Sequence, residues 1–260
     1  MIGGVRQALP RPLRDRFGGD RHGAGMTLVL HLAPGVLFAA AAFPLARIAA
    51  GRGLPPAVGL QAATLAVLAS VQLGTIALAA RLRTGSWRLH GALRYTTRLS
   101  RRRLLLLGTA TLAWAGIVFA LTGPAAEAIR ASLFASWPAE LEYAGHLTDP
   151  DPYPRSVLVA AWVSGLVATT LVAPVVEELY FRGFLLPRLE HLGSWAPVVN
   201  TALFAAYHVW SPWQAPTRIA ATLPLFYATW RTRSLTLAIA VHVALNLIGD
   251  TLASIPIVFR

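Results

Sequence analysis

Long apolar runs, separated by short segments rich in Arg, Gly or Pro, dominate the sequence of this 260-residue chain. A helix needs about 20 mostly apolar residues to cross the ~30 Å hydrocarbon core of a bilayer. The pattern therefore predicts an all-α, polytopic transmembrane bundle of about seven spans, at about 26–50, 57–80, 104–123, 157–186, 195–210, 217–230 and 234–256. The run at 217–230 is too short to cross upright, so it is expected to be partly re-entrant or extended at its outer end.

Composition supports a bilayer as the principal partner of the chain. Hydrophobic residues make up 55% and charged residues 13%, and the mean hydropathy is +0.55, which exceeds what a soluble core requires. The absence of cysteine excludes disulfides, thiolate catalysis and cysteine-based zinc sites, leaving His and Glu as the strong ligand types. All 23 basic residues are Arg and lie mainly between the apolar runs, which indicates a role in topology and no nucleic-acid partner.

The charges also predict an orientation. The segment 81–103 has eight Arg and no acid, whereas 123–155 has five acids and two Arg. Because cytoplasmic loops are enriched in Lys and Arg, the first segment is expected inside and the second outside. A flexible Arg-rich tail at 1–25 then lies in the cytoplasm, 26–50 forms an uncleaved first span, and Arg218 and Arg260 lie on the outer side.

Three short patterns place polar groups inside apolar helices at about 157–186, 195–210 and 234–256. They contain Glu177, Glu178 and Arg182; then Phe204 and His208; then His242 and Asn246. An ionisable residue at the centre of a membrane helix costs ~2.5–3.5 kcal/mol on the insertion scale, so such residues indicate a functional site. A single intramembrane His is more often a packing residue, but three such patterns together favour a site.

Helical geometry predicts how these groups meet. Counted from the cytoplasmic ends of their spans, Glu177, His208 and His242 lie at depths of roughly 12–20 Å, at 1.5 Å per residue. Glu178 and Arg182 are four residues apart and share a helix face, so they are expected to pair. Glu177 points about 100° away around the helix, which leaves it free to act as a base.

These patterns, in this order, resemble the CPBP family (CAAX protease and bacteriocin-processing), which includes type II CAAX prenyl endopeptidases and bacterial Abi-like proteins. The resemblance covers 173–250 and implies a protease core at 124–260 preceded by N-terminal transmembrane helices at 26–123. It implies that Glu177 and His208 activate a water, and that His242 and Asn246 stabilise the oxyanion. Glu178, Arg182 and Phe204 would support this site in an intramembrane endopeptidase.

The expected substrate is a peptide bond of a membrane-associated protein or peptide, with no cofactor. The chain has no HExxH or GxSG motif and no paired-aspartate site on its expected membrane helices. Three alternatives stay open: a variant in which the same Glu and His residues bind zinc, a proton-coupled transporter, and a non-catalytic scaffold or immunity protein. Arg usage and the resemblance favour a bacterial cytoplasmic membrane, which argues against prenylated substrates.

Several polar and aromatic residues outside the three patterns are expected at the membrane interfaces or the protein surface. Trp210 and Trp213 are expected to form an interfacial anchor, with a substrate entrance as the alternative. Asp250 is expected near the outer interface, with a role in tuning the site as the alternative. Four further histidines are expected at surfaces or interfaces, namely His31, His90, His146 and His191.

Overall fold

Helices form nearly all of the regular structure in residues 17–138 and 153–258, which are the residues that the computed structural model describes; side chains are described up to Leu252. The first part of the Arg-rich tail, the segment 139–152 with His146, and Arg260 lie outside the described residues. The described part is all-α, as the sequence predicts.

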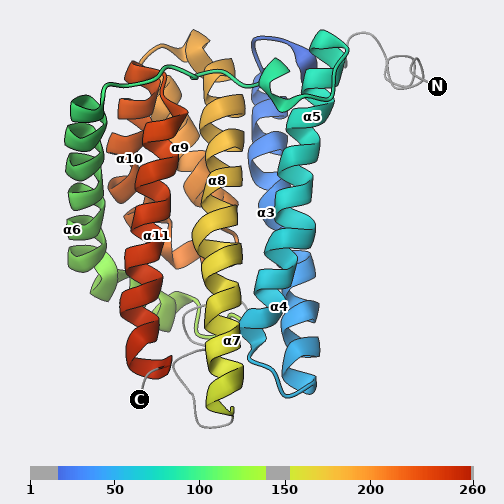
Figure 1. Ribbon diagram of the computed structural model, residues 1–260, viewed down its shortest axis with the longest axis vertical. Coiled ribbons are helices and arrows are strands. Elements are labelled where there is room, and N and C mark those ends of the chain that lie inside the picture. Colours follow the sequence, from blue (N-terminus) through green and yellow to red (C-terminus); the bar gives the residue numbers. More distant parts are fainter. Residues whose placement is uncertain (1–16, 139–152, 259–260) are drawn as a thin grey trace.

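Five helices in this part of the chain are long and apolar enough to cross a membrane. The first is α3 (Ala24–Gly51), the third α6 (Arg101–Leu133) and the last α11 (Leu235–Val258). The second runs continuously through α4 (Pro56–Ala63), η1 (Thr64–Ala69) and α5 (Ser70–Thr84). The fourth runs through α7 (Arg155–Gly165), η5 (Leu166–Val172), α8 (Ala173–Glu177), η6 (Glu178–Leu185) and η7 (Leu186–Leu192). These helices confirm a multi-pass membrane protein (Figure 1).

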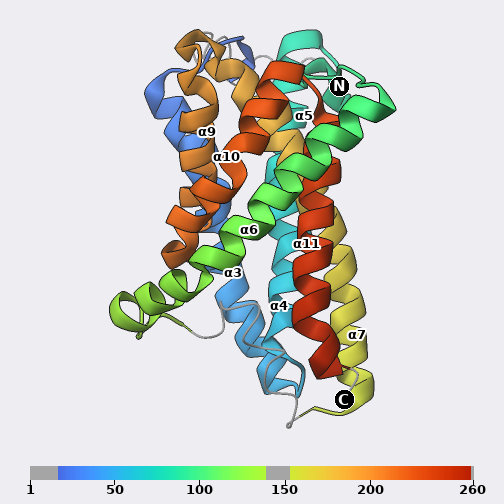
Figure 2. The ribbon, with the colours of Figure 1, turned by 90° about the vertical axis from the view of Figure 1, so that its left-hand side faces the viewer.

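The remaining two expected spans differ from the other five. The helix α9 (Trp195–Tyr207) has 13 residues, or about 20 Å of length, and the short turn η8 (Pro212–Gln214) connects it to α10 (Ala215–Thr232). Figure 2 shows α9 and α10 as a hairpin confined to the half of the bundle in which α3 begins. Neither is among the helices long and apolar enough to cross, so the expected seven spans are confirmed for five only.

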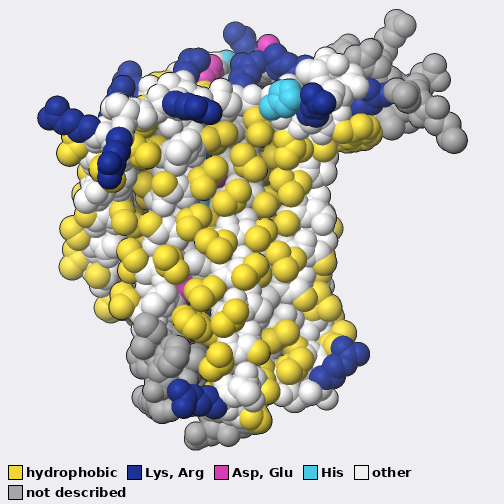
Figure 3. All heavy atoms as spheres, in the orientation of Figure 1, with side chains coloured by type: hydrophobic (Ala, Val, Ile, Leu, Met, Phe, Trp, Pro, Cys, Tyr) yellow, Lys and Arg dark blue, Asp and Glu magenta, His cyan; other side chains and the backbone are white. Residues whose placement is uncertain are grey.

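This hairpin preserves the expected direction of the last helix. Because α9 and α10 leave and return on the same side, α11 begins on the side where α3 begins and runs to the opposite end of the bundle (Figures 1 and 2). The space-filling view shows an apolar band between Arg side chains at both ends, as a lipid-facing surface requires (Figure 3).

Two glycines bring helices unusually close together. A Cβ on Gly59 would lie 2.3 Å from backbone atoms of α3, so only glycine allows α4 to pack there. A Cβ on Gly35 would lie 1.9 Å from the carbonyl oxygen of Tyr207, where α9 ends. Gly35 therefore lets α3 support the end of α9, which carries two residues of the candidate site.

Candidate active site

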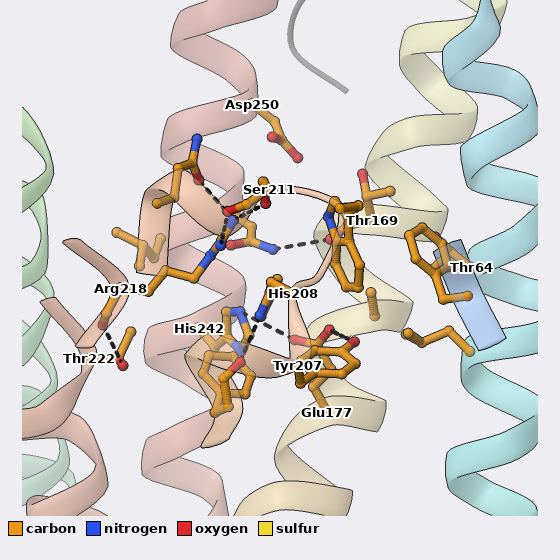
Figure 4. Close-up of a pocket in the computed structure, with 18 of the residues that line it drawn as sticks. Thr64, Thr169, Glu177, Tyr207, His208, Ser211, Arg218, Thr222, His242 and Asp250 are labelled. Atoms are coloured by element: carbon orange, nitrogen blue, oxygen red, sulfur yellow. Dashed lines mark hydrogen bonds and ion pairs between the residues drawn. The ribbon is translucent and has the colours of Figure 1, made fainter. Parts of the chain in front are cut away.

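One cavity of about 390 Å³ lies inside the bundle and brings together most of the candidate residues. Glu177 and Arg182 reach it from α8 and η6, Phe204 and His208 from the end of α9, and His242 and Asn246 from α11. Glu178 does not line the cavity but contacts two residues that do, Arg182 and His242. The structure thus joins the three sequence patterns around one space (Figure 4).

Glu177 is nearly buried, with 6% of its surface exposed. Its Oε1 accepts a hydrogen bond of 2.7 Å from the hydroxyl of Tyr207, and its Oε2 lies 3.8 Å from Nε2 of His242. Tyr207 is fully buried and packs against Phe181 and Trp210. The phenol therefore holds the carboxylate in one orientation beside the cavity.

Glu178 is fully buried and has two partners. Its Oε1 lies 2.7 Å from Nη1 of Arg182, which confirms the pair expected from the spacing of four residues. The same oxygen lies 2.7 Å from Nδ1 of His242. Since a carboxylate only accepts hydrogen bonds, His242 carries its proton on Nδ1 and turns Nε2 towards Glu177.

His208 follows the last helical residue of α9 and has a fixed tautomer. Its Nδ1 lies 2.8 Å from the carbonyl oxygen of Phe204, which can only accept, so Nδ1 is protonated. The Nε2 atom is then left with a lone pair. The ring packs edge-on against Phe204 and Tyr207, which restricts its orientation.

Phe204 and Asn246 complete the set predicted from the sequence. Phe204 is 2% exposed and lies beneath the guanidinium of Arg182, whose Cζ is 4.5 Å from the ring centroid. It also contacts the His242 ring edge-on. Asn246 donates one amide N–H to the carbonyl oxygen of Thr169 at 3.1 Å, and its second N–H is available to a ligand.

The structure places several other residues differently from the sequence interpretation. Arg218, expected on the outer side, lines the cavity. Trp210 and Trp213 also line it, and Trp213 is buried, whereas the sequence favoured an interfacial anchor. Asp250 lines the cavity as well and accepts a hydrogen bond from Thr170 at 2.5 Å, whereas the sequence favoured the outer interface.

His31 is the clearest error among the histidines. It is 1% exposed and bonds through Nδ1 to the carbonyl oxygen of Thr27 and through Nε2 to Asn200. The partner of His31 four residues away is a backbone carbonyl, and Asn200 is 169 positions away in the sequence. No pattern of polar side chains near His31 therefore indicates that it is buried. His90 and His191 are exposed, as expected.

Tyr207 was also missed from the sequence. It directly precedes His208, and a Tyr in an apolar helix is usually a packing residue. Only the bundle shows that α9 directs its hydroxyl at a carboxylate on another helix.

Within residues 17–138 and 153–252, no three His, Asp or Glu side chains are arranged to hold a metal ion. A catalytic zinc site has three protein ligands and an open position. The residues that the structure describes therefore do not fit the zinc variant.

Comparison with protein families finds a match in the part of the chain that contains the candidate residues. Residues 159–248 match the model of the Rce1-like family, described as type II CAAX prenyl endopeptidase Rce1-like. The comparisons with curated proteins and with solved structures gave no match. The matched segment contains all the candidate residues, which line the cavity except for Glu178, and the chain thus carries a domain of the Rce1-like type II CAAX prenyl endopeptidase family.

Proposed function

We propose that this protein is an intramembrane endopeptidase that hydrolyses a peptide bond of a membrane-associated protein or peptide with a water activated by Glu177 and His208. The observation that carries the proposal is the convergence of Glu177, His208, His242 and Asn246 on one cavity between apolar helices. The family of the domain at 159–248 supports peptidase chemistry.

The first step needs a base and an oriented water. The Tyr207 hydroxyl uses one lone pair of Oε1 of Glu177, and the other lone pairs of the carboxylate can accept a hydrogen bond from a water. The same water can donate its second proton to the unprotonated Nε2 of His208. The water oxygen attacks the carbonyl carbon of the substrate and forms a C–O bond. Its proton passes to Glu177 or His208.

The second requirement is stabilisation of the oxyanion. Asn246 has a free amide N–H, and His242 can donate from Nε2 once it is an imidazolium. Glu178 then acts as its counter-ion, in the way a buried carboxylate orients and balances a catalytic histidine. Arg182 also pairs with Glu178, and Nε2 of His242 lies 3.8 Å from Glu177, so the imidazolium and the guanidinium lie beside the two carboxylates.

Collapse of the tetrahedral intermediate completes the reaction. The C–N bond breaks as the proton held by Glu177 or His208 moves to the leaving nitrogen, which gives a carboxylic acid and an amine. Since the groups come from α8, α9 and α11, the bundle must stay packed for the site to work.

The proposal includes an orientation in a bacterial cytoplasmic membrane. The Arg-rich segment 81–103 and the segment 231–233 lie at the end of the bundle where α3 begins (Figure 1). Arg47, Arg52, Arg130 and Arg155 belong to the end of α3, the end of α6 and the start of α7, which lie towards the other end. The positive-inside rule then puts the start of α3 in the cytoplasm. The α9–α10 hairpin enters the membrane from that face.

The decisive experiment compares the membrane proteomes of cells carrying the intact protein or the Glu177→Gln variant. The glutamine is nearly isosteric and still accepts a hydrogen bond from Tyr207. A fragment that appears only with the intact protein identifies a substrate, and purified protein should cleave a peptide spanning that site 10²- to 10⁴-fold faster than the variant. Equal activity of the two proteins would refute the proposed base, and an intact biological effect without any cleavage would favour a scaffold.

A further inference from the structure

Arg218 is a cation in the candidate cavity to which the reaction above gives no role. It lies in the first turns of α10, and its side chain reaches the cavity that Glu177 and His208 also line (Figure 4). An arginine inside an apolar bundle is expensive unless an anion or strong acceptors compensate its charge. The partners of Arg218 therefore show what it is prepared to bind.

Within the residues that the structure describes, the hydrogen-bond partners of Arg218 are neutral oxygens of the turn that precedes α10. Its Nη1 donates to the carbonyl oxygen of Ser211 at 3.2 Å, and its Nη2 donates to Oγ of Ser211 and to Oε1 of Gln214, both at 2.8 Å. A guanidinium has five N–H groups. These three bonds leave two of them for another acceptor.

The charge of Arg218 is not neutralised by a contacting carboxylate. No ion pair joins Arg218 to any Asp or Glu in residues 17–138 and 153–252, whereas Arg182, the other arginine of the cavity, pairs with Glu178. Asp250 lines the same cavity but bonds to Thr170. The cavity thus holds one cation with a contacting counter-ion and one without.

Ser211 and Gln214 also fix the guanidinium in place before any ligand arrives. Both belong to the connection between Tyr207 and Ala215, so they orient the side chain from its own hairpin. A guanidinium held in this way loses little further freedom on binding, and its two remaining N–H groups can donate charge-assisted hydrogen bonds to an anion such as a carboxylate.

We propose that Arg218 binds a carboxylate of the peptide substrate, either an Asp or Glu side chain or a free chain end, and so sets the position of the scissile bond. This inference rests on the proposed peptidase function. The cavity of about 390 Å³ is within the range of small-ligand pockets and accommodates only a short piece of peptide. A carboxylate at Arg218 would therefore lie within a few residues of the carbonyl that faces Glu177 and His208.

A lipid phosphate is the competing occupant, because arginine binds phosphate and carboxylate in similar ways. The substrate carboxylate is favoured because Arg218 shares its cavity with the candidate base, where a peptide has to lie for cleavage. A resident lipid headgroup would occupy the space needed by that peptide.

Matched peptides test the assignment on the purified protein in detergent. A cleaved apolar peptide is prepared in three forms: the parent, one with its acidic side chains replaced by Asn or Gln, and one with an amidated chain end. Loss of the recognised carboxylate should raise KM about tenfold to a hundredfold with little change in kcat, as expected for one charge-assisted contact. The form that loses affinity identifies the source of the carboxylate.

The variant Arg218→Gln should remove this preference, so that acidic and neutral peptides have similar KM values. Arg218→Lys keeps the charge but not the planar guanidinium that Ser211 and Gln214 hold in place, so it should retain part of the preference. The exposed Arg52, just after α3, provides the control Arg52→Gln, which should behave like the parent. Since the preference is a ratio within one protein, reduced stability of a variant does not hide the result.

Binding to the Glu177→Gln protein separates this inference from the peptidase function. The acidic peptide should bind more tightly than its neutral form, and adding Arg218→Gln should abolish that difference. Such binding without cleavage by the intact protein would reject the peptidase function and retain the carboxylate site. Equal binding of the acidic and neutral peptides overturns the inference. It is also overturned if phosphatidylglycerol vesicles displace the acidic peptide more strongly than phosphatidylcholine vesicles do, and if Arg218→Gln abolishes that difference between the two lipids.

Discussion

The carboxylate of Glu178 lies 2.7 Å from Nδ1 of His242, and this contact links two sequence patterns that are 64 residues apart. The same carboxylate oxygen pairs with Arg182. Glu178 therefore does more than neutralise a neighbouring arginine on its own helix. It also fixes the tautomer and ring orientation of a histidine that faces Glu177.

Replacing Glu178 should consequently reduce both stability and activity. Glu178→Gln leaves the buried Arg182 without its counter-ion, and breaking a buried pair typically costs ~3–5 kcal/mol. The amide also no longer balances an imidazolium at His242, so turnover should fall about 10²-fold or more, as for loss of an oxyanion donor. Thermal unfolding in detergent and turnover of the folded fraction measure the two effects separately.

A double variant distinguishes these two roles of Glu178. Neutralising Glu178 and Arg182 together should recover part of the stability, because neither charge is then stranded. It should not recover activity, because His242 still lacks its carboxylate. Glu127→Gln, at an exposed position of α6, is the control and should match the parent in both measurements. Recovery of turnover in the double variant would show that His242 does not depend on Glu178.

Tyr207→Phe should weaken the site without dismantling it. The phenol donates to Glu177 at 2.7 Å, and its loss leaves a buried carboxylate oxygen with one partner fewer. Such a loss costs about 1–3 kcal/mol. We expect lower thermal stability and about tenfold lower turnover, well short of the effect of Glu177→Gln. Unchanged turnover would mean that the carboxylate is positioned without the phenol.

Sequence periodicity predicted those parts of the site that depend on one helix or on depth. The Glu178–Arg182 pair follows from a spacing of four, and the meeting of Glu177, His208 and His242 follows from counting residues along the spans. Contacts between helices depend on rotation and crossing angle, which a single sequence does not specify. The bonds of Tyr207 to Glu177 and of His242 to Glu178 are of this second kind.

The α9–α10 hairpin is the part of the fold that hydrophobicity along the sequence does not predict. Hydrophobicity identifies 195–210 and 217–230 as apolar segments, but a membrane span and half of a buried hairpin have the same composition over 14–16 residues. The turn between them can lie inside the bundle because its polar groups bond within the protein, as Arg218 does with Ser211 and Gln214. Because the sequence pattern predicts two membrane spans here and not a hairpin, it places Arg218 on the outer side, whereas the side chain lines the cavity.

The proposed topology can be mapped with single cysteines, since the natural chain has none. Ser86→Cys, after α5, should react with an impermeant maleimide only when the cytoplasmic face is accessible. Arg52→Cys, after α3, should react from the outside of intact cells. Labelling of both positions from one side would contradict the crossing of the membrane by α4, η1 and α5 between them.

Peptidase activity should survive strong chelation. The proposed water is activated by Glu177 and His208, and the described residues contain no group of three metal-ligating side chains. Incubation with a zinc chelator before the peptide assay should leave the rate unchanged, and added zinc should not raise it. Loss of activity that zinc restores would favour the metal-dependent variant and require ligands beyond those proposed here.

The close approach of α3 to α9 gives a final prediction, at a residue that does not line the cavity. A Cβ at Gly35 would lie 1.9 Å from the carbonyl oxygen of Tyr207, far inside contact distance. Gly35→Ala must therefore push α9 away from α3 and displace Tyr207 and His208. We expect lower thermal stability and a marked loss of turnover, with a larger fall in kcat than Tyr207→Phe causes, because two site residues move together.

Gly74→Ala provides the matched control, because an added Cβ there meets nothing within 4 Å and the residue also lies inside a helix, α5. On helix propensity alone alanine is favoured over glycine by about 0.8–1.0 kcal/mol. The control should thus be as stable as the parent or more so, with normal turnover. If Gly35→Ala behaved like this control, α3 would not determine the position of α9, and the geometry at Tyr207 and His208 would have another origin.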